Sequence, residues 1–171
     1  MKSNKNLILI GMMGSGKSTI GRLLGQKLNL RFFDIDFLIE KKTNMKIAEI
    51  FEKKGEDEFR NLEKEITLKF LNKTNCIISL GGGAFINKNI RENVLKKTIS
   101  IWLDADIKIL IQRIKNNNKR PLLKKNDKEN KLKELYDERK KIYKLAHYRI
   151  LCDNLNKEIL AKKIMKFYAN H

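Results

Sequence analysis

Short apolar runs recur along the chain, and longer segments with helical patterns separate them. The runs do not alternate strictly between apolar and polar residues, which is typical of parallel strands buried on both faces. They predict strands over residues 7–10, 31–34, 76–80, 98–103 and 148–152. The segments between them predict helices over residues 17–28, 35–42, much of 46–71, 87–95, 105–115, 130–147 and 155–168. This alternation predicts an α/β fold, in which helices cover both faces of a parallel sheet.

One stretch departs from this rhythm. Residues 116–128 are polar and lysine-rich and contain Pro121, the one proline of the chain. They predict a mobile loop between two helices, and such loops often close over a site and exclude water. A solvated connector is the alternative and accounts for most of the lysines, but Arg120 beside the rigid Pro121 is better placed for function than a random surface charge.

Length and composition indicate one globular domain. The 171 residues, 42% of them hydrophobic, can bury a substantial core, and the sequence shows no internal repeat. A single domain, residues 1–171, is therefore expected to supply every site. Cys76 and Cys152 lie in or beside apolar stretches, which predicts buried thiols and neither a disulfide frame nor a zinc site.

Hydropathy and charge limit location and partners. No apolar run approaches the roughly 20 residues of a membrane span, and the first residues lead into a strand without a signal-peptide apolar region, so we expect a cytoplasmic protein. The 38 Lys and Arg against 20 Asp and Glu give a net charge of +18, which attracts anions, nucleic acid among them. The lysines are scattered and lack interleaved aromatic residues, which favours a general lysine enrichment over nucleic-acid binding.

The strongest motif follows the first predicted strand. Residues 11–18 read Gly-Met-Met-Gly-Ser-Gly-Lys-Ser, the spacing of a phosphate-binding P-loop. Its backbone amides and the N-terminus of the next helix are expected to face the phosphates of a nucleotide. Lys17 should reach the β- and γ-phosphates, and the Ser18 hydroxyl should coordinate magnesium. A chance match is the alternative, and the flanking strand and helix argue against it.

Two carboxylates follow the second predicted strand, at Asp34 and Asp36. Because the carboxyl ends of parallel strands face the ligand crevice, both are expected near the P-loop. In one arrangement Asp34 helps to hold magnesium through water, and Asp36 meets an acceptor hydroxyl as a base or positioning group. The alternative makes them a helix cap and a first-turn acid, and the P-loop context favours the functional interpretation.

A second glycine-rich turn, Gly81-Gly82-Gly83, follows the third predicted strand. Three glycines let a ligand approach the backbone and offer amide donors, although a structural tight turn has the same composition. With the P-loop at one strand end and this turn at another, two ligands could meet in one crevice.

Three arginines are further candidates. Arg60 and Glu63 share a helical face, which by itself indicates an ordinary surface ion pair. Arg113 follows the fourth predicted strand, and Arg139 lies in the helix before the fifth. A guanidinium suits a carboxylate or a stacked base, but spacing alone does not separate these roles from simple solvation.

Taken in order, these pieces resemble the shikimate kinases over nearly the whole chain. The matching segments are Gly-Met-Met-Gly-Ser-Gly-Lys-Ser-Thr at 11–19, Phe-x-Asp-x-Asp at 32–36, Ile-x-Glu-Ile-Phe at 47–51, Gly-Glu-x-x-Phe-Arg-x-x-Glu at 55–63, Leu-Gly-Gly-Gly-Ala at 80–84, Arg-Pro-Leu-Leu at 120–123 and Arg-x-x-x-Tyr at 139–143. Many kinases share a P-loop, whereas this ordered set is far more specific.

The resemblance implies a three-layer α/β/α fold with a five-stranded parallel sheet in the order 2-3-1-4-5, which is the architecture of P-loop kinases. It implies phosphorylation of the shikimate 3-hydroxyl by magnesium-ATP, on the route to chorismate and the aromatic amino acids. It also implies a shikimate-binding helical segment at about 35–63, a lid at about 115–128 and a monomeric enzyme.

Site residues carried over by the resemblance fall into four groups. The ATP site would contain Gly14, Ser15, Gly16, Lys17, Ser18, Thr19, Arg113 against adenine, and Arg120. The shikimate site would contain Asp36, Arg60, Gly81, Gly82, Gly83 and Arg139, with the two arginines on the carboxylate. Lys17, Asp36 and Arg120 would be catalytic. Ser18, and Asp34 through water, would hold magnesium.

Two other classes of protein stay open at this stage. One is a related kinase that phosphorylates gluconate or a nucleoside monophosphate, although the arginines and the glycine turn argue against a nucleotide acceptor. The other is a P-loop protein that uses its charge to bind nucleic acid, and salt-sensitive binding without phosphotransfer would distinguish it.

Overall fold

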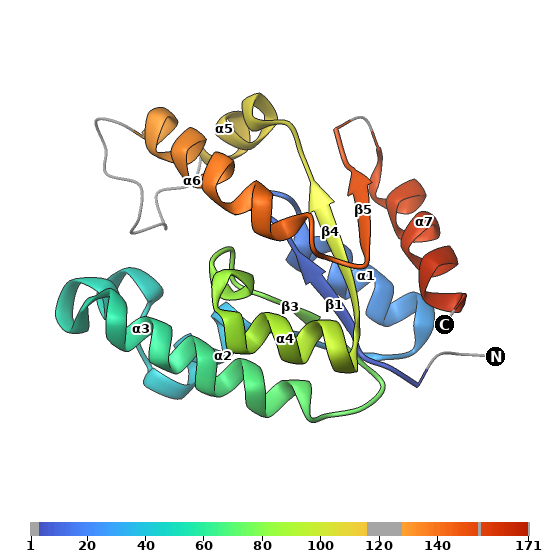
Figure 1. Cartoon of the computed structure of the whole chain (residues 1–171), viewed down its shortest axis with the longest axis horizontal. Coiled ribbons are helices and arrows are strands. Elements are labelled where there is room, and N and C mark those ends of the chain that lie inside the picture. Colours follow the sequence, from blue (N-terminus) through green and yellow to red (C-terminus); the bar gives the residue numbers. More distant parts are fainter. Residues whose placement is uncertain (1–3, 116–127, 154, 171) are drawn as a thin grey trace.

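The computed structural model describes residues 4–115, 128–153 and 155–170, and over these it forms a five-stranded parallel sheet in the order β2-β3-β1-β4-β5 (Figure 1). The predicted α/β fold and the strand order are confirmed. The strands are β1 (Leu7–Ile10), β2 (Arg31–Asp34), β3 (Cys76–Ser79), β4 (Ile99–Asp104) and β5 (Tyr148–Leu151). Each lies within one residue of its predicted position, because the buried apolar runs mark the strands clearly.

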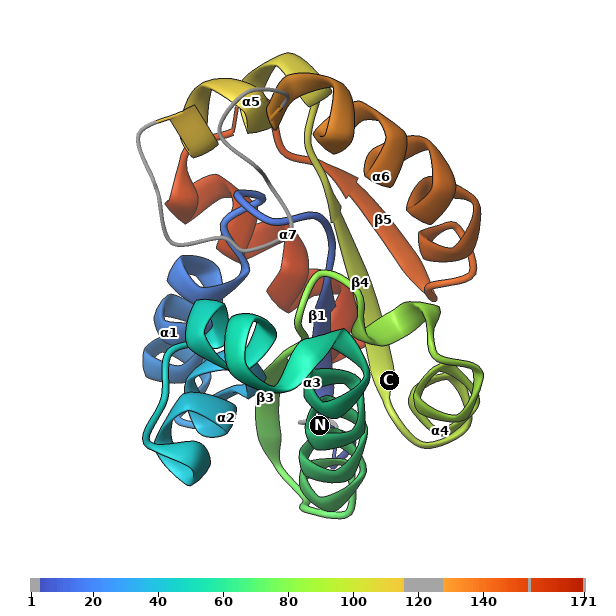
Figure 2. The same cartoon turned by 90° about the vertical axis from the view of Figure 1, so that its left-hand side faces the viewer.

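Helices cover both faces of the sheet. They are α1 (Lys17–Leu28), α2 (Ile35–Thr43), α3 (Ile47–Leu71), α4 (Lys88–Lys97), α5 (Ile107–Lys115), α6 (Lys128–Tyr143) and α7 (Lys157–Ala169), with a 3₁₀ turn η1 (Ala84–Ile86). Helices α1 and α7 pack together on one face, and α3, α4 and α6 lie on the other (Figures 1 and 2). Strands β1, β3 and β4 are buried on both sides at the centre of the core.

Two predicted helices differ from the structure. Helix α6 ends at Tyr143, four residues before the predicted end. Beyond it the chain turns, and His147 binds Ser100 at the start of β4 through Ser100 N–H to His147 Nδ1 at 3.1 Å. Helix α3 contains a break at Gly55, whose φ of 85° is a left-handed conformation that glycine adopts most easily. This break changes the direction of the following part of the helix, which carries Arg60.

Strand register brings the site segments to one edge. Asp34 at the end of β2 is paired with Ser79 at the end of β3, and Ser79 is paired with Leu9 of β1. After β1 the chain forms β2 and β3 on one side of β1, and then β4 and β5 on the other side. The direction of the strand order therefore reverses at β1. Crevices at the carboxyl ends of strands at such a reversal are the usual ligand sites of open α/β sheets.

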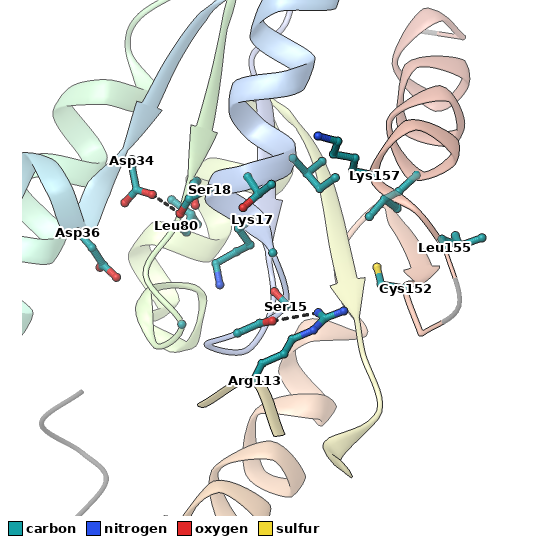
Figure 3. Close-up of a pocket in the computed structure, with 17 residues that line it drawn as sticks. Ser15, Lys17, Ser18, Asp34, Asp36, Leu80, Arg113, Cys152, Leu155 and Lys157 are labelled. Atoms are coloured by element: carbon teal, nitrogen blue, oxygen red, sulfur yellow. Dashed lines mark hydrogen bonds between the residues drawn. The ribbon is translucent and has the colours of Figure 1, made fainter. Parts of the chain in front are cut away.

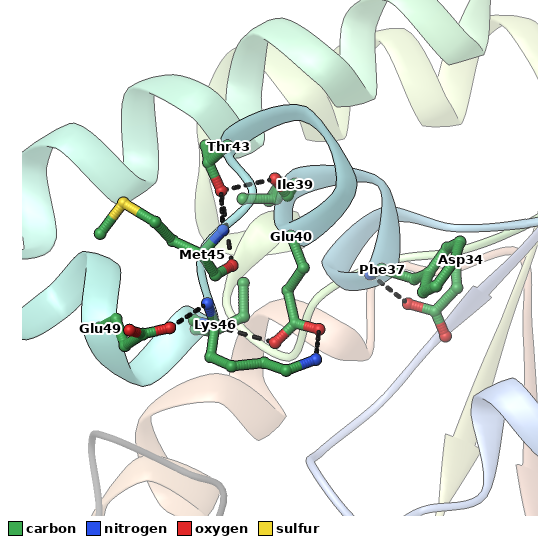
Figure 4. A network of polar contacts seen from close by, with 9 residues as sticks. Asp34, Phe37, Ile39, Glu40, Thr43, Met45, Lys46 and Glu49 are labelled. Carbon is green, nitrogen blue, oxygen red and sulfur yellow. Dashed lines mark hydrogen bonds and ion pairs between the residues drawn. The ribbon is translucent and has the colours of Figure 1, made fainter.

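The connection between α2 and α3 is held by local polar contacts (Figure 4). Glu40 accepts hydrogen bonds from the Ile47 amide and from Lys46 Nζ, each at 3.1 Å. Glu49 accepts one from the Lys46 amide at 2.7 Å, which satisfies an unpaired donor at the start of α3. These contacts fix the angle at which α3 leaves α2.

Both cysteines are buried free thiols, as the sequence predicts. Within the described ranges, no helix combines the length and the apolar character needed to cross a membrane.

A buried carboxylate joins the end of β4 to β5 and α6, and its cation Arg149 is half exposed. Asp104 is 2% exposed and accepts hydrogen bonds from Arg149 Nε at 2.8 Å and from the Tyr136 hydroxyl at 3.0 Å. Arg149 Nη2 lies 2.7 Å from the same carboxylate, and the guanidinium stacks over the Trp102 ring. One carboxylate therefore holds three elements together.

Replacing Arg149 with Ala should lower the free energy of unfolding by about 1–3 kcal/mol, because Asp104 would stay buried without its cation. Urea denaturation measures this. Lys27→Ala, which removes the exposed pair with Glu158, is the matched control and should cost less than about 1 kcal/mol. Equal effects of the two substitutions would contradict the importance of burial at Asp104.

Candidate active site

A cavity of about 460 Å³ opens at the carboxyl edge of the sheet (Figure 3). The P-loop forms one wall, Asp34 and Asp36 form another, and the end of β5 with the start of α7 closes the third. Residues lining it are Gly14, Ser15, Gly16, Lys17, Ser18, Thr19, Ile20, Asp34, Asp36, Ser79, Leu80, Gly82, Arg113, Cys152, Leu155, Lys157 and Leu160. The structure thus brings together the segments 14–19 and 34–36, which the sequence assigns to one crevice.

The P-loop has the backbone that its glycines allow. Gly14 and Gly16 have φ values of 81° and 92°, which place successive amides around a concave turn before α1 begins at Lys17. Lys17 spans the loop and donates hydrogen bonds to the Gly11 and Met12 carbonyls at 2.8 and 2.9 Å. The loop and the lysine therefore form one anion-binding unit at a helix N-terminus.

Asp34 performs two tasks at once. Its Oδ1 accepts a hydrogen bond from the Phe37 amide at 3.3 Å and caps α2, and its Oδ2 accepts one from the Ser18 hydroxyl at 2.5 Å. The helix-cap interpretation and the functional interpretation are compatible, since different oxygens serve each.

Magnesium suits this pair of residues. Mg²⁺ prefers hard oxygen ligands and usually keeps several waters, so a hydroxyl and a carboxylate beside a phosphate loop fit it. Among the described residues, no group of three or more His, Cys, Asp or Glu could hold a metal ion.

The far end of the cavity is more apolar, and of its residues Cys152 and Leu160 were not predicted. Cys152, Leu155 and Leu160 line it, opposite Arg113, whose Nη1 donates to the Gly14 carbonyl at 3.1 Å. Burial raises the pKa of Cys152 to about 12, so the thiol keeps its proton and acts as a small apolar group. Nothing local in the sequence distinguishes these residues from other core positions; only the end of β5, at the same edge as the P-loop, points to them.

The glycine turn after β3 is the meeting point of the charged side chains. A Cβ atom built on Gly81 would lie 2.3 Å from Glu63 Oε1 and 2.8 Å from Asp36 Oδ1, and one on Gly83 would lie 2.5 Å from Arg60 Nη1. A Cβ on Gly82 would lie 3.3 Å from Arg139 Nη1. Charged side-chain ends from α2 and α3 thus occupy the space at Gly81 and Gly83 where a Cβ would lie, and Arg139 of α6 packs closely against Gly82.

Arg60, whose side chain is 29% exposed, pairs with a buried Glu63, which corrects the interpretation of the two as an ordinary surface ion pair. Arg60 Nη1 lies 2.7 Å from Glu63 Oε2, and the Glu63 side chain is only 3% exposed. The same guanidinium binds Glu56, which is exposed, through Nε and Nη2. Spacing could reveal the pair but not its burial, which depends on how α3 packs.

Burial and charge set the ionisation of this pair. Burial raises the pKa of Glu63, and the nearby Asp36 raises it further, while Arg60 opposes both. Burial lowers the pKa of Arg60, but Glu63 and Glu56 outweigh it and the pKa is raised. Among the described residues Glu63 Oε1 has no hydrogen-bond partner, and it points toward Gly81 beside Asp36.

A second cavity of about 400 Å³ lies on the other side of the glycine turn. Arg60, Glu63, Gly83 and Arg139 line it, and Arg139 is 5% exposed although α6 is mostly polar. Gly82 lines the first cavity and Gly83 the second. The turn thus separates a phosphate-binding cavity from one lined by two guanidinium groups.

One predicted site residue is not placed. Arg120, and the lid at about 115–128 to which it belongs, fall in a segment of which residues 116–127 lie outside the described residues. The role of Arg120 stays a prediction.

Comparison with known proteins identifies the family. The family model described as shikimate kinase matches residues 13–169, which is nearly the whole chain. The chain belongs to the shikimate kinase family. A shikimate kinase from Sulfurihydrogenibium sp. is 43% identical over 161 residues, which cover 94% of this chain and 96% of the relative.

Solved structures agree with the family assignment. The shikimate kinase from Acinetobacter baumannii, solved in complex with shikimate, is 34% identical and has a TM-score of 0.93, covering 97% of this chain and 93% of that one. A gluconokinase from Sinorhizobium meliloti is 10% identical with a TM-score of 0.63, covering 99% and 94%, which shows a shared fold alone. The fold is thus common to several kinases, and the sequence match selects shikimate kinase.

Replacing Glu63 with Gln should change the acid side of the pH profile. Because its pKa is raised, Glu63 gains a proton, and weakens its hold on Arg60, at a higher pH than an exposed glutamate would. The kcat/KM of the wild type for shikimate should fall as the pH falls through that pKa. Glu63→Gln should have a lower kcat/KM near neutral pH and a flatter acid side, measured between about pH 5 and 8.

Glu56→Gln is the control, because Glu56 binds the same guanidinium from an exposed position and should leave the acid side of the pH profile unchanged.

The pH dependence of stability offers a second measurement. A raised pKa in the folded protein means that the contribution of Glu63 to stability is greatest when it is protonated and is lost as the pH rises through that pKa. Glu63→Gln should remove this dependence, and an acid side identical to that of the wild type would contradict the role of Glu63.

Proposed function

We propose that the two cavities on either side of the glycine turn are the ATP and shikimate sites of this chain, and that the γ-phosphoryl group of ATP passes to the shikimate 3-hydroxyl where they meet. The observation that carries this proposal is the convergence of Arg60, Arg139 and Asp36 on the glycine turn beside the P-loop. The bound shikimate in the relative from Acinetobacter baumannii supports the choice of acceptor.

The nucleotide side is assigned by its phosphate chemistry. The amides of residues 14–19 and Lys17 would bind the phosphates, and the apolar end near Leu155 and Arg113 would take the base. Ser18, and Asp34 through water, would hold Mg²⁺, which neutralises phosphate charge when it is bound. Lys17 stabilises the charge that develops on the transferring group.

The acceptor side is assigned by its charge. Shikimate is a small, rigid carboxylate with ring hydroxyls. Arg60 and Arg139 offer planar guanidinium groups that match a carboxylate, and Gly81, Gly82 and Gly83 let it approach the backbone. Asp36, which lines the phosphate-binding cavity, would accept a hydrogen bond from the 3-hydroxyl and orient its oxygen toward the phosphorus.

The remaining features of the proposal concern the chain as a whole. We assign both sites to one domain and expect a monomer that works in the cytoplasm. The sequence carries the expectation that Arg120 joins the transferring phosphoryl group from the lid.

An acceptor screen tests the proposal. Release of ADP from magnesium-ATP is measured with shikimate, quinate, gluconate and AMP as parallel acceptors, and turnover confined to shikimate is expected. Turnover with another acceptor only would refute the acceptor assignment. No turnover with any, together with salt-sensitive binding to DNA or RNA, would favour a nucleic-acid-binding protein instead.

Asp36→Asn should lower kcat with shikimate by about 100-fold or more, because an amide cannot accept the proton and orients the hydroxyl poorly. The KM for ATP should stay within about twofold, since the proposal assigns Asp36 to the acceptor hydroxyl and not to the nucleotide. Steady-state kinetics measures both. Asp57→Asn, an exposed carboxylate of α3, is the control, and an unchanged kcat for Asp36→Asn would remove Asp36 from the mechanism.

Arg139→Ala should raise the KM for shikimate by about 10- to 100-fold, because one of two charged hydrogen-bond partners of the carboxylate is lost. The KM for ATP should change far less. Arg22→Ala, on the exposed side of α1, is the control for loss of one positive charge. A KM for shikimate equal to that of the wild type would show that Arg139 does not hold the substrate.

A further inference from the structure

Tyr143 is part of the Arg-x-x-x-Tyr segment, in which only Arg139 has a role so far. The two residues are four positions apart on α6 and therefore lie on one face of the helix. Tyr143 is wholly buried, whereas α6 as a whole is polar. Tyr143 therefore faces the core, where its hydroxyl needs a hydrogen-bond partner.

The partner of the Tyr143 hydroxyl is the glycine turn. The hydroxyl donates a hydrogen bond to the Gly82 carbonyl and lies 3.7 Å from Met12 Sδ in the P-loop. The ring packs against Trp102 of β4, with 5.8 Å between ring centroids. Burial raises the pKa of Tyr143 to about 12, so the hydroxyl keeps its proton and remains a donor.

This contact determines which way the turn presents its amide. A trans peptide bond holds its carbonyl and its N–H on opposite sides. Fixing the Gly82 carbonyl against Tyr143 therefore fixes the direction of the Gly83 N–H. Arg139 lies against the same turn, 3.3 Å from the position of a Cβ on Gly82. The orientation of the amide and the guanidinium are thus set from one helix.

We propose that Tyr143 is a positioning residue for shikimate. It holds the Gly82–Gly83 peptide in one orientation beside Arg139, so that the Gly83 N–H and the Arg139 guanidinium meet the substrate carboxylate in a preformed arrangement. The inference rests on the proposed function of this site. It assigns Tyr143 an effect on the acceptor and not on the nucleotide, although the residue also contacts the P-loop.

A matched substitution separates positioning from stability. Tyr168 of α7 is 3% exposed, and its hydroxyl donates to the Lys5 carbonyl at 2.8 Å, on the opposite face of the sheet from α6. Tyr143→Phe and Tyr168→Phe each remove one buried hydroxyl that donates to a backbone carbonyl. A merely structural role would give the two variants the same kinetic behaviour.

The experiment compares both variants with the wild type for kcat, for the KM of shikimate and ATP, and for shikimate binding without ATP by calorimetry. Tyr143→Phe should raise the KM and the Kd for shikimate by about 3- to 10-fold, as expected for loss of one hydrogen bond. Its KM for ATP and its kcat should stay within about twofold. Tyr168→Phe should match the wild type in all four.

Other outcomes overturn the inference. The hydroxyl would be a general structural element if Tyr143→Phe kept its shikimate affinity or lost affinity equally for shikimate and ATP. The same conclusion would follow if both variants lost affinity equally, or if Tyr143→Phe did not fold. A wild-type protein that does not phosphorylate shikimate would instead refute the proposed function, so the two failures are distinguishable.

Discussion

The arrangement of the charged groups in this protein depends on three consecutive glycines that have no side chains. At Gly81 and Gly83, charged groups from α2 and α3 lie where Cβ atoms would be, and Arg139 of α6 lies 3.3 Å from the position of a Cβ on Gly82. These charged side chains can approach the backbone of the turn so closely because the turn has no side chains of its own. The sheet register places that turn beside the P-loop, so the same constraint sets the distance between the two cavities.

Most of the fold can be predicted from local pattern. Parallel strands buried on both faces leave apolar runs that are hard to mistake, and each strand was found within one residue. The ends of α6 and the break in α3 depend on contacts that the pattern does not contain. His147 ends the turn after α6 by binding Ser100, which is 47 residues away, and Gly55 breaks a helix whose apolar pattern continues on both sides.

The site divides in the same way. The P-loop is a contiguous segment whose glycine spacing indicates phosphate binding. The location of Asp34 and Asp36 near it could be predicted from their place at the end of a strand. Glu63 could not be separated from a surface ion pair, because its burial results from the packing of α3 against the glycine turn. Cys152 and Leu160 at the apolar end were missed for a similar reason, since they become neighbours of Arg113 only in the folded sheet.

Asp34 joins the two halves of the site through one carboxylate. One oxygen binds Ser18 of the P-loop helix, and the other caps α2, whose first turn carries Asp36. A displacement of Asp34 on the nucleotide side therefore moves the helix that faces the acceptor. If one ligand favours a given position of Asp34, it changes the affinity for the other ligand. By thermodynamic linkage, the second ligand then changes the affinity for the first by the same factor. In the proposed arrangement of the two sites, Asp34 therefore links nucleotide and acceptor by a route separate from their meeting at the γ-phosphoryl group.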